Sequence, residues 1–383
     1  MDKTEKSLSY MNQLDALRAF AVGAVLIEHF FPTTSSIYKF WEWGGAGVRL
    51  FFVISGFLIT GILLSYRETA EQQDLKRTKA LKMFYIRRFI RIFPIYYLTL
   101  AITAILGVQY VRETLGWHLS YTSNIFFSIT NDWHGPVAHL WSLSVEEQFY
   151  LVWPLFILFL PKVWIKSFLL IIISIGFSSR LIFSLMGANL IASNSLTFQC
   201  FDFLGVGGLI AYTRLYSNEF NKSTIKIARV AGMVCTLGLL PFYHMLGLFP
   251  LNLWLSVMYS IARMVSFAWI VAQTSQGFSG LLGKILGFAP ISYIGKISYG
   301  IYLYHNFLRF WFNDQLLARN IYMRNSVKAV LLTTLTLVVA SLSWYIFEKP
   351  INDQKRLFEF PPRRLADSTL LNAEQSKVNL QNA

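Results

Sequence analysis

Runs of apolar residues long enough to cross a lipid bilayer recur along the whole 383-residue chain. A transmembrane helix needs about 20 largely apolar residues. Helices are suited to the bilayer core because their backbone N–H and C=O groups form hydrogen bonds with one another, where no water is available. The sequence offers ten such runs: about 14–32, 47–64, 92–108, 147–161, 167–187, 197–213, 228–246, 251–272, 291–312 and 327–347. We therefore expect an all-α polytopic membrane protein, a bundle of about ten transmembrane helices with no soluble catalytic domain.

Composition supports this class. Apolar residues make up 55% of the chain and charged residues only 14%, whereas a soluble domain carries about 25% charged residues. The net charge of +14 falls mostly in links between apolar runs, so we expect a lipid bilayer as partner and no nucleic acid. Cys200 and Cys235 form neither a disulfide framework nor a metal-ligand spacing, and no metal site is expected.

Lysines and arginines in the links predict the orientation. They gather between the second and third runs, between the sixth and seventh, and after residue 350. Both termini are therefore expected in the cytoplasm, with a membrane domain at 1–350 and a polar, flexible cytoplasmic tail at 351–383. Arg319, Arg324 and Lys328 fall on the opposite side. Charged residues interrupt the first run, which is therefore not a cleavable signal peptide.

Ionisable residues inside apolar runs mark functional candidates. In the first run, Arg18 and His29 are 11 residues apart, which puts them about 20° apart around a helix and about 16 Å apart along it. Histidine is the natural proton acceptor near neutral pH. A packing role against a neighbouring Ser or Tyr is an equal alternative for His29.

FYIRRFIRIFPIYY enters the third run and places Arg88 and Arg91 on adjacent turns of one helix face. Paired guanidinium groups suit phosphate oxygens, and we expect the helix N-terminus to add positive potential there. The alternative is that these arginines anchor the helix beside lipid headgroups. For Arg87, which points elsewhere, we favour that anchoring role.

HLWSLSVEEQFYLVWP opens the fourth run, which Trp153-Pro154 would interrupt. Ser144 and Glu147 fit a capping box, a structural role for Glu147. Glu146 is then the candidate functional carboxylate. His139 and Trp141 in the same segment are functional or interfacial.

SYGIYLYHNF in the ninth run sets Ser298, Tyr302 and His305 on one stripe. A polar stripe in an apolar helix faces protein or a cavity rather than lipid, so these residues either contact substrate or pack in the core.

The remaining polar candidates carry less information. Asp202 would form an ion pair with either Arg180 or Arg263, and the sequence does not choose between them. We expect the remaining histidines to lie in loops or at the membrane interface: His118, His134 and His244.

Five segments in this order resemble the integral-membrane acyltransferase-3 family: LDALRAFAVGAVLIEH, GVRLFFVISGFLIT, FYIRRFIRIFP, HLWSLSVEEQFYLVWP and ISYGIYLYH. Each segment alone is weakly specific, whereas five in one order are specific. The resemblance runs from about residue 12 to about residue 350. Members of this family move acyl groups, commonly acetyl from acetyl-CoA, onto sugars of surface polysaccharides, lipopolysaccharide O-antigens or peptidoglycan, or onto secreted small molecules.

The resemblance implies an O-acetyltransferase of the bacterial cytoplasmic (inner) membrane, with acetyl-CoA or another acyl-CoA as donor and no permanently bound cofactor. The acceptor would be a glycan or glycolipid. His29 would be the general base or acyl carrier, assisted by Arg18 or Glu146, and Arg88 and Arg91 would bind the donor.

Two departures and one competing class remain. Many relatives have an acidic residue where Arg49 stands, and some carry an appended SGNH hydrolase-type domain that we do not expect in these 383 residues. The competing class is a secondary transporter or flippase with a charge relay. The sequence shows neither an inverted repeat nor paired broken helices, which favours the enzyme, and it predicts no oligomeric state.

Overall fold

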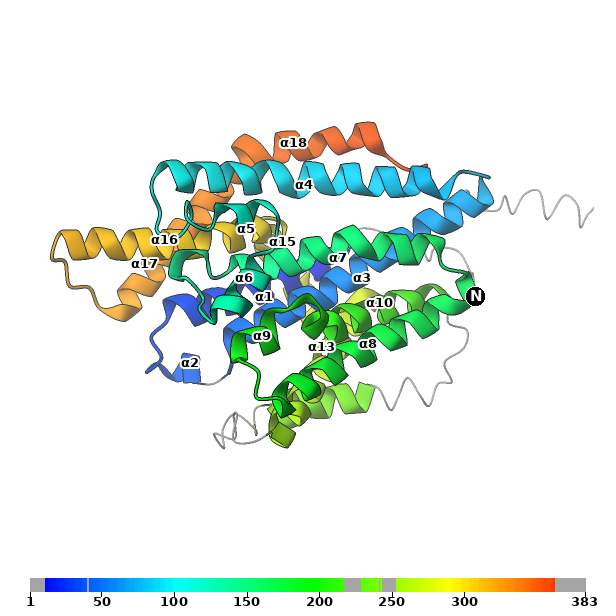
Figure 1. The fold of residues 1–383 in the computed structure, drawn as a ribbon, viewed down its shortest axis with the longest axis horizontal. Coiled ribbons are helices and arrows are strands. Elements are labelled where there is room, and N and C mark those ends of the chain that lie inside the picture. Colours follow the sequence, from blue (N-terminus) through cyan, green and yellow to red (C-terminus); the bar gives the residue numbers. More distant parts are fainter. Residues whose placement is uncertain (1–10, 40, 217–228, 241, 243–252, 362–383) are drawn as a thin grey trace, which may run out of the picture.

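The computed structural model describes residues 11–39, 41–216, 229–240, 242 and 253–361, and within these ranges all regular structure is helical (Figure 1). Both chain termini and His244 lie outside the described residues, as do parts of the predicted seventh and eighth runs. The described chain forms one bundle whose helices run mostly along its long axis.

Helix α3 (Trp43–Gln72) is the centre of the bundle. It packs against α1 (Asn12–Phe30), α7 (Leu140–Phe159) and α10 (Phe201–Tyr216). In the most apolar 18-residue window of α3, 78% of the residues are buried, against 11% in α8 (Lys162–Leu185). Helix α3 therefore contacts mainly protein, whereas α8 lies at the periphery.

Glycines let α3 and α10 approach each other at backbone distance. A Cβ atom at Gly56 of α3 would collide with the backbone oxygen of Leu204, and one at Gly207 of α10 would collide with the backbone oxygen of Val53. Small residues allow such close crossings in membrane proteins. The central pair of helices is therefore held by direct backbone packing.

Peripheral helices carry the surface that would face lipid. Large apolar side chains of α8 are exposed: Val163, Trp164, Leu170, Ile171, Ile175, Ile182 and Leu185. Exposed apolar patches of this kind are typical of surfaces that contact membranes or partners. The remaining long helices are α4 (Arg77–Ile105), α13 (Leu253–Gln276), α16 (Ser298–Ala318) and α17 (Asn325–Ser343).

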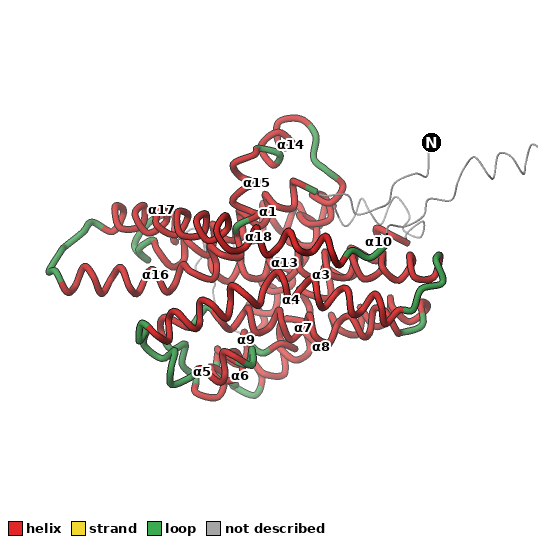
Figure 2. Tube along the Cα trace, turned by 90° about the horizontal axis from the view of Figure 1, so that it is seen from above, coloured by secondary structure: helices red, strands yellow, loops and turns green. Residues whose placement is uncertain are grey.

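Short helices complete the bundle. They are α2 (Ser36–Lys39), α5 (Leu115–Leu119), α6 (Ser123–Thr130), η1 (Gly135–Val137), α9 (Leu190–Ser195), η2 (Thr197–Cys200), η3 (Cys235–Leu239), α14 (Gly280–Leu286), α15 (Ala289–Lys296), η4 (Trp344–Glu348), α18 (Lys349–Asp353) and η5 (Gln354–Phe358). Helix α18 lies along α4, and α14 and α15 stand on the side of the bundle away from α5 and α6 (Figure 2).

The predicted count of about ten transmembrane helices is not confirmed. By length and composition, four helices of the described part can cross a membrane: Trp43–Gln72, Arg77–Ile105, Lys162–Leu185 and Asn325–Phe358. Other helices occupy predicted runs but do not meet that standard. Helix α10 has only 16 residues, and α1 carries Asp15, Arg18 and Glu28.

Several predicted boundaries were also wrong. The third run was expected to begin at 92, but α4 begins at Arg77. The fourth was expected at 147–161, but α7 begins at Leu140 and continues through Pro154 without interruption. The ninth run is divided at Ile297 into α15 and α16.

The bundle has two distinct ends along its long axis. The α3–α4 and α7–α8 turns lie at one end, which we call the basic end because Lys76, Arg77 and Lys162 are there. The opposite end holds α2, α9 and the α16–α17 turn (Figure 1). This arrangement agrees with the predicted placement of Arg319 and Arg324 away from the other basic links.

Candidate active site

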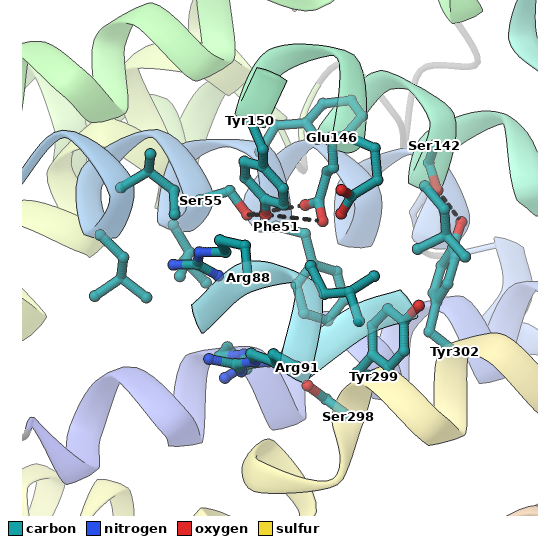
Figure 3. Close-up of a pocket in the computed structure, with 18 of the residues that line it drawn as sticks. Phe51, Ser55, Arg88, Arg91, Ser142, Glu146, Tyr150, Ser298, Tyr299 and Tyr302 are labelled. Carbon is teal, nitrogen blue, oxygen red and sulfur yellow. Dashed lines mark hydrogen bonds between the residues drawn. The ribbon is translucent and has the colours of Figure 1, made fainter. Parts of the chain in front are cut away.

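Side chains from α1, α3, α4, α7 and α16 surround a cavity of about 90 Å³ inside the bundle, which we call the inner cavity. Figure 3 shows Arg88, Arg91, Glu146 and Tyr302 turned toward this one space. It brings together six of the residues predicted from the sequence: Arg18, Arg88, Arg91, Glu146, Ser298 and Tyr302.

Glu146 is held by two hydroxyl groups. Ser55 of α3 donates a hydrogen bond to Oε1 (2.9 Å), and Tyr150, one turn further along α7, donates to Oε2 (3.1 Å; Figure 3). Hydrogen bonds of this kind stabilise a carboxylate and fix its rotamer. Glu146 is therefore a positioned group, and sequence reasoning missed both Ser55 and Tyr150.

The capping box predicted for Glu147 is wrong. Because α7 already begins at Leu140, Ser144 lies inside the helix, where its hydroxyl donates to the carbonyl of Leu140 (3.0 Å). Glu147 is free of any capping role and lines the inner cavity together with Glu146. The cavity therefore has two carboxyl side chains rather than one.

Arg88 and Arg91 face the same cavity from successive turns of α4. The Arg88 guanidinium lies over the rings of Tyr150 (5.2 Å) and Phe84 (5.6 Å), a favourable cation–π arrangement. Because α4 begins at Arg77, its N-terminus is too far away to add positive potential here, contrary to expectation.

Neither arginine forms an ion pair within the described part of the chain, whereas Arg18 lies 3.7 Å from Asp15. Arg87 was expected beside lipid headgroups. In the structure it donates to the backbone oxygens of Lys355 (3.3 Å) and Phe358 (3.4 Å).

A second cavity, of about 580 Å³, lies between the inner cavity and the end opposite the basic end, and we call it the outer cavity. His29, in the last turn of α1, lines it. Val48 and Tyr302 line both cavities and form the wall between them. The Tyr302 hydroxyl is bonded to Ser142 (2.5 Å) and donates to the backbone oxygen of His139 (3.2 Å).

Arg18 and Glu146, which were expected to assist His29, line the inner cavity and not the outer one. The polar neighbour of His29 is instead Arg309 of α16, whose Nη1 lies 3.4 Å from His29 Nδ1. A guanidinium has only donors, so the neutral imidazole accepts at Nδ1 and carries its hydrogen on Nε2. Sequence reasoning missed Arg309.

His29 begins a line of three histidine rings. The ring centroids of His29 and His305 are 4.9 Å apart, and those of His305 and His139 are 5.0 Å apart. His305 was expected in a substrate cavity with Ser298 and Tyr302, but it is fully buried and lines neither cavity. Its Nδ1 is 2.6 Å from the Tyr302 backbone oxygen, and its ring packs against that of His29, so we assign His305 a packing role.

Other charges at membrane depth pair within the protein. Of the two arginines considered for Asp202, Arg180 forms the ion pair (2.7 Å), while Arg263 pairs with Glu42 (2.8 Å). Arg49 lines the outer cavity and donates to Cys200 Sγ (2.8 Å) and to the backbone oxygen of Asn194 (2.8 Å). The described residues contain no cluster of metal-ligating side chains.

Comparison with known proteins identifies the family. A family model described as an acyltransferase domain, of the acyltransferase-3 type, matches residues 11–345. The chain belongs to the acyltransferase-3 family.

Three curated relatives show how similar the chain is to known members of this family. The chain is 30% identical over 373 residues to the peptidoglycan O-acetyltransferase OatA of Listeria monocytogenes, covering 91% of this chain and 57% of that relative. It is 28% identical to the O-acetyltransferase OatA of Staphylococcus aureus (93% and 59%) and 27% identical to the putative peptidoglycan O-acetyltransferase YrhL of Bacillus subtilis (90% and 55%). The chain thus spans under two thirds of each of these relatives, and no solved structure matches it.

In this acyltransferase-3 chain, the two cavities offer different chemistry. The inner cavity is lined by three guanidinium groups and two carboxyl groups. The guanidinium groups can bind an anionic ligand, and the carboxyl groups can accept hydrogen bonds from a polar arm of that ligand. The larger outer cavity is lined by two imidazoles, His29 and His139, and a neutral imidazole can accept a proton. Val48 and Tyr302 line both cavities and therefore lie between them.

Proposed function

We propose that this chain is a membrane O-acetyltransferase that moves acetyl from acetyl-CoA to a hydroxyl group of a cell-surface glycan. The observation that carries the proposal is the pair of cavities meeting at Tyr302, one lined by Arg88 and Arg91 and the other by His29. The relatives named peptidoglycan O-acetyltransferases support a sugar acceptor.

The inner cavity receives the donor from the cytoplasmic side, which we assign to the basic end. Arg88 and Arg91 bind phosphate oxygens of CoA, because guanidinium forks match phosphate geometry. At about 90 Å³ the inner cavity has to widen to admit any part of CoA beyond a few atoms. In this proposal the phosphates stay beside the two arginines, and the pantetheine arm extends past them and leads the thioester toward Tyr302.

His29 carries out the chemistry in the outer cavity. It removes the proton of the acceptor hydroxyl, whose oxygen attacks the thioester carbon and displaces the CoA thiolate. The imidazolium then returns the proton to that thiolate, so the products are the acetyl ester and free CoA. An acetyl-imidazole formed on His29 and then transferred to the hydroxyl gives the same products.

Transfer requires the thioester to pass the wall between the cavities. Tyr302 is bonded to Ser142 and, through its backbone oxygen, to His305. A rotation of this one side chain would open the wall without moving a helix. An opening made by one side chain would favour a small acyl group such as acetyl.

The test uses the purified 383-residue chain in liposomes with radiolabelled acetyl-CoA and glycan strands isolated from peptidoglycan. We expect label on the glycan as an ester that mild base releases, and none with His29→Ala. Accumulation of unmodified glycan inside the vesicles without an acyl donor would instead indicate a transporter and would overturn the proposal.

A further inference from the structure

A third cavity, of about 310 Å³, opens beside His29 at the end opposite the basic end, and we call it the side cavity. His29 and Arg309 line both the side cavity and the outer cavity. The other polar side chains around it are Thr33, Thr34, Asn313, Asn325 and Lys328. The side cavity therefore adjoins the imidazole to which we assign the chemistry.

The side cavity is cationic. Arg309 and Lys328 both line it, and no aspartate or glutamate is among the described residues around it. Two other arginines of the bundle do have carboxylate partners, Arg180 with Asp202 and Arg263 with Glu42. Within the described part of the chain, neither Arg309 nor Lys328 forms such an ion pair.

The nearest carboxylate of α1 is already engaged. Glu28, adjacent to His29, accepts a hydrogen bond from the Tyr38 hydroxyl (2.7 Å) and another from the backbone N–H of Gly44 (3.2 Å). Glu28 lines the outer cavity and not the side cavity. It therefore does not neutralise the two cations where they face the side cavity.

Two cations that face one cavity without a carboxylate among the described residues around it suit an anionic ligand. We propose that the side cavity binds an acidic group of the acceptor glycan, a carboxylate held by Arg309 and Lys328, beside the hydroxyl that is acetylated. This inference rests on the proposed function and adds the acceptor's charge to it. Asn313, whose side-chain oxygen is buried without a hydrogen-bond partner among the described residues, would accept from a sugar hydroxyl.

The same binding event prepares His29. In the structure, Arg309 donates toward His29 Nδ1, the nitrogen that carries the lone pair. A base must present that lone pair to the acceptor hydroxyl, so the guanidinium has to turn away. A carboxylate in the side cavity gives Arg309 a stronger hydrogen-bond acceptor. An acidic acceptor therefore both docks beside His29 and frees it.

The test compares two forms of one acceptor. Glycan strands of peptidoglycan, stripped of peptides by an amidase, carry a free carboxylate on each muramic acid, and the second probe is the same strands with those groups converted to methylamides. The chain is embedded in phosphatidylcholine nanodiscs, and both binding of labelled strands and transfer from acetyl-CoA are measured.

We expect the native chain to bind the acidic strands about tenfold more tightly, the effect of one charge-assisted hydrogen bond. Lys328→Gln should lower this ratio severalfold, mainly through KM in the transfer assay, with Arg309 retaining the remainder, and Lys328→Arg should restore it. Arg324→Gln is the matched control, because Arg324 is exposed one turn earlier and does not line the side cavity.

The outcomes separate the two proposals. Equal binding of both strands by the native chain would overturn the anion site even if transfer proceeds. A preference that depends on Lys328 without any transfer would keep the anion site and remove the proposed function. Loss of the preference when phosphatidylglycerol replaces phosphatidylcholine would assign the site to a lipid headgroup and overturn the acceptor assignment.

Discussion

Adjacent arginines of α4 have different surroundings and therefore different expected roles. Arg88 and Arg91 face the inner cavity, whereas Arg87 is bonded to the backbone of the segment after α18. We predict that Arg88→Gln or Arg91→Gln raises KM for acetyl-CoA about tenfold or more, because a hydrogen bond to a charged group is worth about 1.5–3 kcal/mol. Radiolabelled acetyl-CoA binding and initial rates measure this.

Arg87→Gln is the control for that pair, since it removes the same charge from the same helix. It should leave KM for acetyl-CoA within about twofold of the native value. Equal effects of Arg87→Gln and Arg88→Gln would indicate a general attraction of basic side chains for CoA and would contradict a built donor site.

His118 gives a prediction about pH and stability outside the long helices. It is buried in α5 between Thr114 and Ser123, each 2.7 Å from a ring nitrogen. Burial lowers the pKa of His118 to about 4, whereas the unfolded chain titrates near 6.5. Stability is therefore fully present above about pH 6.5 and falls as the pH drops toward 4, by up to about 2 kcal/mol at pH 5.

The thermal midpoint of the detergent-solubilised protein, measured between pH 7.5 and 5, tests this. Between pH 7.5 and 5 the thermal midpoint of the native protein should fall further than that of His118→Gln, which has no imidazole to protonate. Parallel losses in the two proteins would show that His118 does not contribute to the acid sensitivity.

The sequence suggested much of the candidate site and missed its long-range contacts. Arg18, His29, Arg88, Arg91 and Glu146 were found because each stands in a local pattern. Arg309 was missed since its contact with His29 joins residues 280 positions apart, and no local pattern records such a pairing. The wrong capping box at Ser144 has the same origin, because tertiary packing lets α7 begin earlier.

Among the elements, the crossing of α3 and α10 is the feature most sensitive to side-chain size. We predict that Gly56→Ala destabilises the protein by about 1–3 kcal/mol, because the new methyl group would press on the backbone of Leu204. Gly23→Ala on α1 is the control, since a Cβ there meets no atom within 4 Å. It should be neutral or up to about 1 kcal/mol stabilising, and a similar loss in both variants would argue against the close crossing.

Many helix positions were predictable from the long apolar runs, but helix ends were not. The sequence placed the start of the third run 15 residues too late, because the polar residues from Arg77 onward extend α4 beyond the part a bilayer would cover. Hydropathy detects the apolar portion of a helix and does not detect a polar extension of the same helix. Ile297, which separates α15 from α16, is itself apolar and left no signal.

At the scale of the whole molecule, the two ends of the bundle should face opposite sides of the membrane. Gln72, at the end of α3, and Tyr322, in the α16–α17 turn, are both exposed and lie at opposite ends. With Cys235 replaced by Ala, we predict that Gln72→Cys reacts with an impermeant maleimide only from the cytoplasmic side, and Tyr322→Cys only from outside. Labelling of both from one side would contradict the arrangement.

The account as a whole depends on acetyl transfer through His29. The most direct measurement is mass spectrometry of the surface glycans of cells in which the gene is deleted, restored, or restored as His29→Ala at matched membrane levels. We predict an acetyl increment on the glycan with the native chain only. An unchanged increment with His29→Ala would contradict the role of His29, and no acetyl difference between deleted and restored cells would contradict the proposed transfer itself.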